Sequence, residues 1–172
     1  MKFAVNDLVI YKISGVCRIS EIKECTFGGV CGKYYILNPV YDGKSVIFVP
    51  VDSPLSDKMR KLLTRAEVDE IIGTMPQDAF DWIENDRERS EKIKEVTTSG
   101  DRTRIARMIK TLWLRRKALA ERGKKLRITD EAALHSAEKI LYDEFAYALG
   151  IAREDVPAYI EAKIAEAKAP KA

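Results

Sequence analysis

Residues 46–67 read VIFVPVDSPLSDKMRKLLTRAE, and the pattern of the sequence changes within this stretch. The run Val46–Val49 is short and apolar, as β-strands often are, and prolines follow it closely. Thr64, with Glu67 three residues later, predicts a capping box at the start of a helix. We therefore expect a β module that ends at residue 55 and a helical module beyond it.

The part of the chain before this boundary has the pattern of short strands joined by tight turns. Gly28-Gly29 and Asp42-Gly43 are typical of hairpin turns, because they tolerate a positive φ. Ile22 breaks the alternation of the longest strand. These signals predict a small twisted antiparallel β-barrel within residues 1–50. The expected strands are Asp7–Tyr11, Val16–Phe27, Val30–Tyr41 and Val46–Val49.

The rest of the chain has helical periodicity, and we expect only helices over residues 56–168. Gly73 is the expected end of the first helix, and a long second segment follows Pro76 and runs to Ser99-Gly100. The later helices are expected to begin at Asp101, at Thr129 and near Asp155. The fold class is therefore α+β, with a β module over residues 1–55 and a compact all-helical domain over residues 56–172.

Composition excludes several classes of protein. The 172 residues are 46% hydrophobic and 33% charged, as in ordinary globular proteins. No apolar run is long enough for a transmembrane helix, and the N-terminus lacks the apolar region of a secretory signal. We expect a cytoplasmic protein that has no contact with a membrane and is a monomer.

Residues that could support catalysis or metal binding are few. The spacing of the three cysteines, Cys17, Cys25 and Cys31, matches no common zinc motif, and His135 is the one histidine. The glycine-rich stretch 28–32 lacks the Lys-Ser/Thr pair and the helix of a phosphate-binding loop. We therefore expect no enzyme, no metal, no cofactor and no small-molecule substrate.

Charge is divided unevenly along the helical part. Residues 101–128 carry eleven basic and two acidic side chains, whereas residues 64–100 carry five and ten and residues 129–172 carry five and nine. A concentrated positive face favours binding to a phosphate backbone. The same basic helix could also pack against the acidic segments on either side of it. The sequence leaves both interpretations open.

The candidate nucleic-acid contacts come from two successive helical segments. One set lies away from the apolar stripe of the basic helix: Arg104, Arg107, Lys110 and Lys117. The other set precedes Ser99-Gly100: Arg87, Arg89 and Lys92. An antiparallel pairing of the two segments would merge the sets into one surface, whose phosphate contacts would carry little sequence information.

The two tryptophans have different contexts. Trp113 lies at the edge of the apolar stripe, so we expect it mainly in the core. Trp82 lies off the face that Phe80 and Ile83 define. It is either a partly exposed aromatic anchor for a partner, of the kind that stacks on unpaired bases, or a lid over the junction between the helices.

Four segments of the β half form a recognisable combination. They are Val5–Tyr11, Gly15–Ile22, Lys33–Leu37 and Val46–Val51, the last ending in Val-Pro-Val. The first two resemble the first hairpin of the CarD-like proteins, a family of bacterial transcription regulators, and the other two resemble its next strands.

The helical half resembles the same family at three places. They are Ser99-Gly100-Asp101, Leu112-Trp113 and Ala137–Leu141. The resemblance covers roughly residues 1–150, and its strand pattern is more specific in combination than any single piece.

The resemblance implies a Tudor-like barrel, shared with transcription-repair coupling factors, that binds the β subunit of RNA polymerase through an edge strand. By position, that strand holds Val46, Ile47, Phe48 and Val49. It also implies that the helical domain meets promoter DNA at the upstream edge of the melted bubble and stabilises the open complex. Trp82 and the basic residues after it would lie on the DNA side. A protein–protein adaptor with no DNA contact is the alternative.

Overall fold

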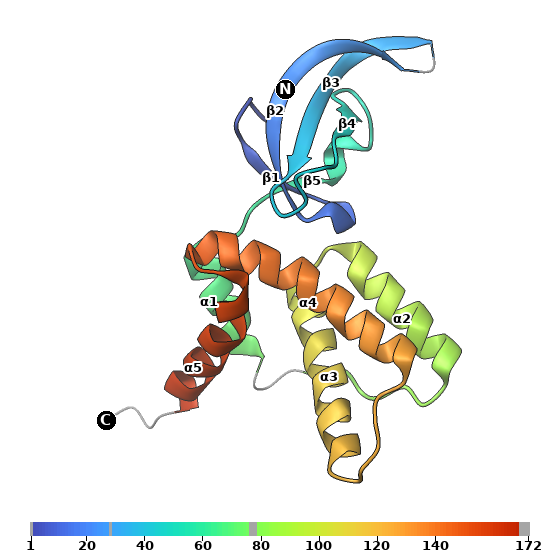
Figure 1. Ribbon diagram of the computed structural model, residues 1–172, viewed down its shortest axis with the longest axis vertical. Coiled ribbons are helices and arrows are strands. Elements are labelled where there is room, and N and C mark those ends of the chain that lie inside the picture. Colours follow the sequence, from blue (N-terminus) through green and yellow to red (C-terminus); the bar gives the residue numbers. More distant parts are fainter. Residues whose placement is uncertain (1, 28, 76–78, 169–172) are drawn as a thin grey trace. The chain divides into compact units, whose positions relative to one another are not determined.

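The computed structural model describes residues 2–27, 29–75 and 79–168. Contacts divide the chain into two units, Met1–Leu62 and Leu63–Ala172, each with its own hydrophobic core. Figure 1 shows strands in the first unit and helices in the second. The α+β class is confirmed.

The first unit is one antiparallel sheet with the strand order β4-β3-β2-β1-β5. Figure 1 shows β2 and β3 as a long curved hairpin. Gly29, at the turn of this hairpin, has φ +79°, while its neighbour Gly28 lies outside the described residues. The strands are β1 (Leu8–Tyr11), β2 (Val16–Phe27), β3 (Val30–Pro39), β4 (Ile47–Pro50) and β5 (Met59–Lys61).

A bulge in β2 accounts for the broken alternation at Ile22. Ile19 pairs with Leu37 and Glu21 with Ile36, so Ser20 is an extra residue in the ladder. The bulge reverses the phase of the strand, and Ile22 therefore packs against the same core as Ile19.

The expected closed barrel is wrong. β4 and β5 are the two ends of the sheet, and within the described residues they do not pair with each other. Closure requires the edge strands to share a ladder. β4 has four residues and β5 has three, so each is too short to provide much of one.

The expected boundary after residue 55 lies too early, and residues 56–168 are not all helical. β5 pairs with β1 through Val9↔Lys61 and Tyr11↔Met59, which extends the first unit to Leu62. The physical reason is Met59, which is 1% exposed and completes the core of the sheet.

The second unit contains five helices in the described residues. Their ends follow local sequence signals: Thr64 and Glu67 form the expected capping box, Asp101 accepts from the N–H of Arg104, and Gly150 has φ +70°. The helices are α1 (Arg65–Thr74), α2 (Asp86–Ser99), α3 (Arg102–Ala120), α4 (Ile128–Leu149) and α5 (Val156–Lys168).

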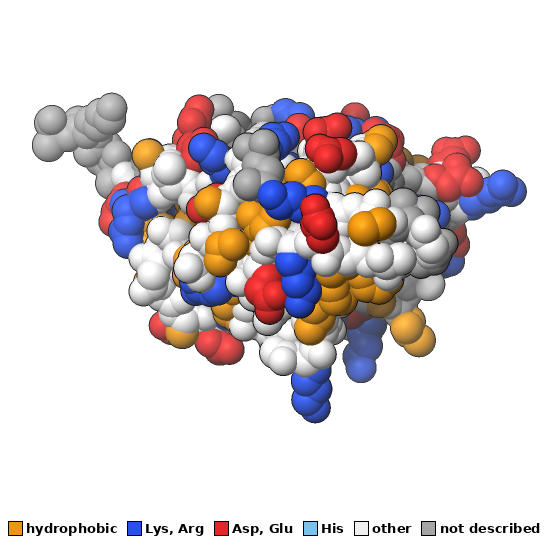
Figure 2. Space-filling model, turned by 90° about the horizontal axis from the view of Figure 1, so that it is seen from above, with side chains coloured by type: hydrophobic (Ala, Val, Ile, Leu, Met, Phe, Trp, Pro, Cys, Tyr) orange, Lys and Arg blue, Asp and Glu red, His pale blue; other side chains and the backbone are white. Residues whose placement is uncertain are grey.

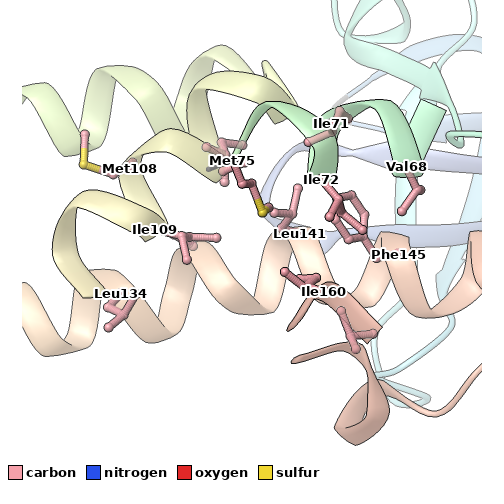
Figure 3. Packing of buried hydrophobic residues seen from close by; sticks show 14 of the residues in the cluster. Val68, Ile71, Ile72, Met75, Met108, Ile109, Leu134, Leu141, Phe145 and Ile160 are labelled. Atoms are coloured by element: carbon pink, nitrogen blue, oxygen red, sulfur yellow. The ribbon is translucent and has the colours of Figure 1, made fainter. Parts of the chain in front are cut away.

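α4 lies at the centre of the helical core. Leu134, Leu141 and Phe145, all on α4, are 0% exposed. Figure 3 shows side chains from α1, α3, α4 and α5 gathered into one cluster, with Ile72 of α1 close to Phe145. α3 makes its most extensive helix contact with α4, so the basic helix has one face fixed against the core.

The segment before α2 differs from expectation. Gly73 lies inside α1, and α2 begins only at Asp86, after Asn85 caps it through the N–H groups of Arg87 and Glu88. Pro76 lies outside the described residues. Residues 79–84 are non-helical, and side chains satisfy part of their backbone, as when the N–H of Phe80 donates to Thr111 Oγ1 at 2.9 Å.

No helix in the described ranges has both the length and the apolarity to cross a membrane. These same residues contain no cluster of histidine, cysteine and carboxylate side chains that could hold a metal ion.

Thiol reactivity should follow burial along the β unit. Burial raises the pKa of the Cys17 thiol to about 11, whereas Cys31 is exposed. Because the thiolate is the reactive form, Ellman's reagent should modify Cys31 first and Cys17 only after urea unfolds the sheet. Modification of Cys17 at the same rate as Cys31 in the folded protein would contradict this description of the core.

Candidate functional site

β4 has one free edge. The strand pairs with β3, and within the described residues no other strand pairs with it. The N–H of Val51 donates to the carbonyl of Lys33 at 2.8 Å. Because backbone donors alternate in direction along an antiparallel strand, the N–H of Val49 faces β3 and that of Phe48 faces the free edge. Pro50, which has no N–H, falls on the free side too, where edge strands tolerate proline.

Three of the four predicted polymerase-binding residues lie in β4, and Val46 lies just before it. Val49 is buried and Ile47 packs against the same core. Phe48 faces the other way, is 39% exposed and has its ring 4.7 Å from that of Phe27, between centroids. The strand therefore offers backbone groups at its edge and an aromatic side chain on one face.

Trp82 contacts two arginines of the helical unit through its ring. The guanidinium carbon of Arg89 is 4.5 Å from its ring centroid, and that of Arg115 is 4.8 Å. The side chain is half-buried and packs against the helical core. Its Nε1 is buried and has no hydrogen-bond acceptor among the described residues. Both features expected of Trp82, an aromatic anchor and a residue at a junction, are compatible with this position.

Arg89 is buried rather than displayed. It is 5% exposed and donates to both carboxylate oxygens of Asp130, at 3.0 and 2.9 Å, and to Asp86 at 2.6 Å. It also donates to the carbonyls of Ile83 and Glu84. The hydrogen bond with Asp130 raises the pKa of Arg89. Arg89 thus contacts the Trp82 ring from a position that these hydrogen bonds fix.

Glu95 on α2 joins the two predicted sets of basic residues. It binds Arg104 of α3 at 2.6 Å and Lys92 of its own helix at 3.0 Å. The hydrogen bond from Arg104, followed by that from Lys92, lowers the pKa of Glu95. Arg87 is exposed and pairs with Glu91 on the same helix. The two helices are in contact, as the merged surface requires.

The remaining predicted residues lie on α3. The Arg107 guanidinium lies 5.8 Å from the Phe80 ring centroid, Lys110 is half-buried, and Lys117 is exposed. Lys117 Nζ is 5.9 Å from the ring of Trp113. Trp113 itself is 42% exposed, so its expected place in the core is wrong. It follows the buried Leu112, and one residue along a helix turns the side chain by about 100° away from the stripe.

Internal charge compensation also occurs. Arg102 binds the buried Glu144 at 2.6 Å, Arg116 binds Glu131 at 3.1 Å, and Arg127 binds Asp86. Figure 2 shows acidic and basic side chains interspersed on the face that it draws. The acidic segments therefore neutralise part of the basic segment.

Three basic residues that the sequence reasoning did not select follow α3. Arg122, Lys124 and Lys125 are exposed, and the described part of the chain provides no salt bridge to them. The basic run around Gly123 could have indicated them. They were missed because the candidate contacts were chosen from the helix before Gly123.

Family comparison matches both units. The CarD-like/TRCF RID domain matches residues 3–63, and the CarD C-terminal domain matches residues 70–161. The second match alone spans more than half of the chain, so the chain belongs to the CarD-like family. Its members are transcription regulators that interact with RNA polymerase, rather than enzymes. No curated protein matches the chain.

Proposed function

We propose that the chain is a non-enzymatic transcription regulator that holds RNA polymerase with one unit and promoter DNA with the other. The edge of β4 binds the β subunit, and the α2–α3 surface meets DNA at the upstream edge of the bubble, which stabilises the open complex. The free edge of β4 is the observation that carries this proposal.

The polymerase contact follows from the geometry of β4. An exposed strand edge binds an extended segment by adding it to the sheet, and main-chain hydrogen bonds supply the affinity. The outward N–H of Phe48 is one such donor. The exposed rings of Phe48 and Phe27 lie beside the edge and offer an apolar contact to the incoming strand.

The DNA contact rests on Trp82 and the basic residues around it. Arg87, Lys92 and Arg104 come from α2 and α3, and the lysines and arginine further along α3 continue the surface: Arg107, Lys110 and Lys117. Such residues position a phosphate backbone, whereas Trp82 provides the aromatic ring for an unstacked base. Arg89 contributes through Trp82, because its own donors are occupied.

An adaptor without DNA contact is the second candidate, and the internal ion pairs of α3 favour it. Salt separates the two candidates. Binding through several phosphate contacts weakens steeply as salt rises, whereas binding through an apolar anchor does not. We expect the affinity for a promoter fragment to fall at least about tenfold between 50 and 200 mM salt.

Proline at Phe48 should weaken binding to the β subunit by about tenfold, because it removes an edge donor and its ring obstructs the incoming strand. Phe48→Ala is the matched control, since it loses the same side chain and keeps the N–H. Titration of the isolated β subunit against both variants measures the difference, with duplex DNA affinity as the reference. Equal affinities of the two variants, with the sheet still folded, would eliminate pairing through this edge.

A further inference from the structure

The two arginines that enclose Trp82 are restrained very differently. Arg89 has five hydrogen bonds, and its side chain is 6% exposed. Among the described residues, Arg115 has one carboxylate partner, Glu84, at 3.7 Å, and its side chain is 36% exposed. Its Nε is buried with no acceptor among the described residues. The indole therefore has one guanidinium contact that is firmly held and one that is loosely held.

Trp82 is itself incompletely satisfied where it lies. Its Nε1 is buried without an acceptor in the described residues, and such a donor carries a free-energy cost. A nucleic-acid acceptor that reached the indole would remove this cost.

A polar cavity of about 190 Å³ lies beside the enclosed indole. Trp82 and Arg115 line it together with three more cations, Arg89, Lys125 and Arg127. The carboxylates of Glu84, Asp86 and Asp130 line it too, and Asp86 and Asp130 already bind Arg89. Lys125 is exposed, and no salt bridge to it occurs among the described residues.

We propose that Arg115 is a positioning residue that covers one face of Trp82 in the free protein and transfers to a nucleic-acid phosphate on binding. The phosphate attracts the guanidinium toward Lys125 and Arg127, and the uncovered face of the indole stacks on an unpaired base. Arg89 stays in place and keeps the ring oriented. This inference rests on the proposed function, since it assumes that Trp82 meets DNA.

The physical reason is an exchange of similar partners. A guanidinium over an indole gains a modest attraction, which grows when water is excluded. A phosphate oxygen offers charge-assisted hydrogen bonds to the same guanidinium, and these are stronger than a contact with a carboxylate 3.7 Å away. Arg89 cannot make this exchange without breaking its bonds to Asp130. Arg115 is therefore the arginine that leaves the indole, while Arg89 remains bound.

The test uses Trp113→Phe protein, in which Trp82 is the one remaining tryptophan. Acrylamide quenching of Trp82 fluorescence reports how far the ring is covered. Arg115→Ala should raise the quenching constant of the free protein about twofold, because one face of the ring is uncovered. Arg116→Ala is the control, since Arg116 has the same 36% side-chain exposure and pairs with Glu131. Arg115→Lys, which keeps the charge without the planar group, should fall between them.

A forked duplex with unpaired bases should then quench the Trp82 emission of the Trp113→Phe protein that retains Arg115. A blunt duplex of equal length should not. An Arg115→Ala constant equal to that of the parent would overturn the inference and leave the proposed function intact. A bound fork with unchanged Trp82 emission would overturn the inference and also remove Trp82 from the proposed DNA contact. If the fork does not bind in an electrophoretic mobility-shift assay at low salt, both the inference and the proposed DNA contact are overturned.

Discussion

Arg89→Ala should lower the free energy of unfolding of the helical unit by about 3–5 kcal/mol, because it breaks a buried ion pair. The side chains of Arg89 and Asp130 are 6% and 3% exposed. Removal of the guanidinium leaves the Asp130 carboxylate buried without its partner and two carbonyls without their donor. Since domains are stable by about 5–15 kcal/mol, this loss approaches the whole stability of a small unit.

Urea denaturation followed by circular dichroism measures this loss. Arg87→Ala is the matched control, because Arg87 lies on the same helix and its side chain is 89% exposed in its pair with Glu91. An exposed pair of this kind contributes about 0–1 kcal/mol. If Arg89→Ala costs no more than Arg87→Ala, the buried pair does not stabilise the domain, and our account of how Trp82 is held is wrong.

Trp82→Ala should shorten the lifetime of the promoter open complex by about tenfold to a hundredfold, the equivalent of losing one base–aromatic stack of 1–3 kcal/mol. Binding to plain duplex should stay nearly unchanged, because the phosphate contacts come from other side chains. The measurement is the decay of open complexes on one promoter after addition of a competitor.

Two controls keep this result interpretable. Trp113→Ala removes the other tryptophan, which is 42% exposed on α3 and is not assigned to the DNA contact, so the lifetime should not change. A urea melt of Trp82→Ala shows whether the domain is still folded, since Trp82 packs against the core. A folded Trp82→Ala protein with an unchanged lifetime would make Trp82 a structural residue of the helix junction.

The elements that local sequence determines were predictable. The bounds Val16–Phe27 of β2 agree with expectation, because β-branched and aromatic residues recur along it and glycines flank it in the sequence. The capping residues Thr64 and Asp101 mark true helix starts, since each accepts from a backbone N–H three residues on. Hydrogen bonds of this local kind depend on only a few adjacent residues, so the sequence indicates them directly.

Features that depend on distant partners were not predictable. β5 has three residues and one buried apolar side chain, Met59, so it has no periodicity of its own. The burial of Arg89 depends on Asp130, 41 residues further along the chain, and in sequence Arg89 resembles its exposed neighbours. The free edge of β4 follows from the order of the strands, which the run Val46–Val49 does not reveal by itself; only the family resemblance implied an edge strand there.

The central claim is that one chain holds polymerase and promoter DNA at the same time. Its most direct test is the lifetime of the open complex on one promoter, measured without the chain, with it, and with Phe48→Pro. We expect the chain to prolong the lifetime and Phe48→Pro to lose most of that gain while it still binds DNA. A lifetime that is the same with and without the chain would contradict the account, as would full activity of Phe48→Pro.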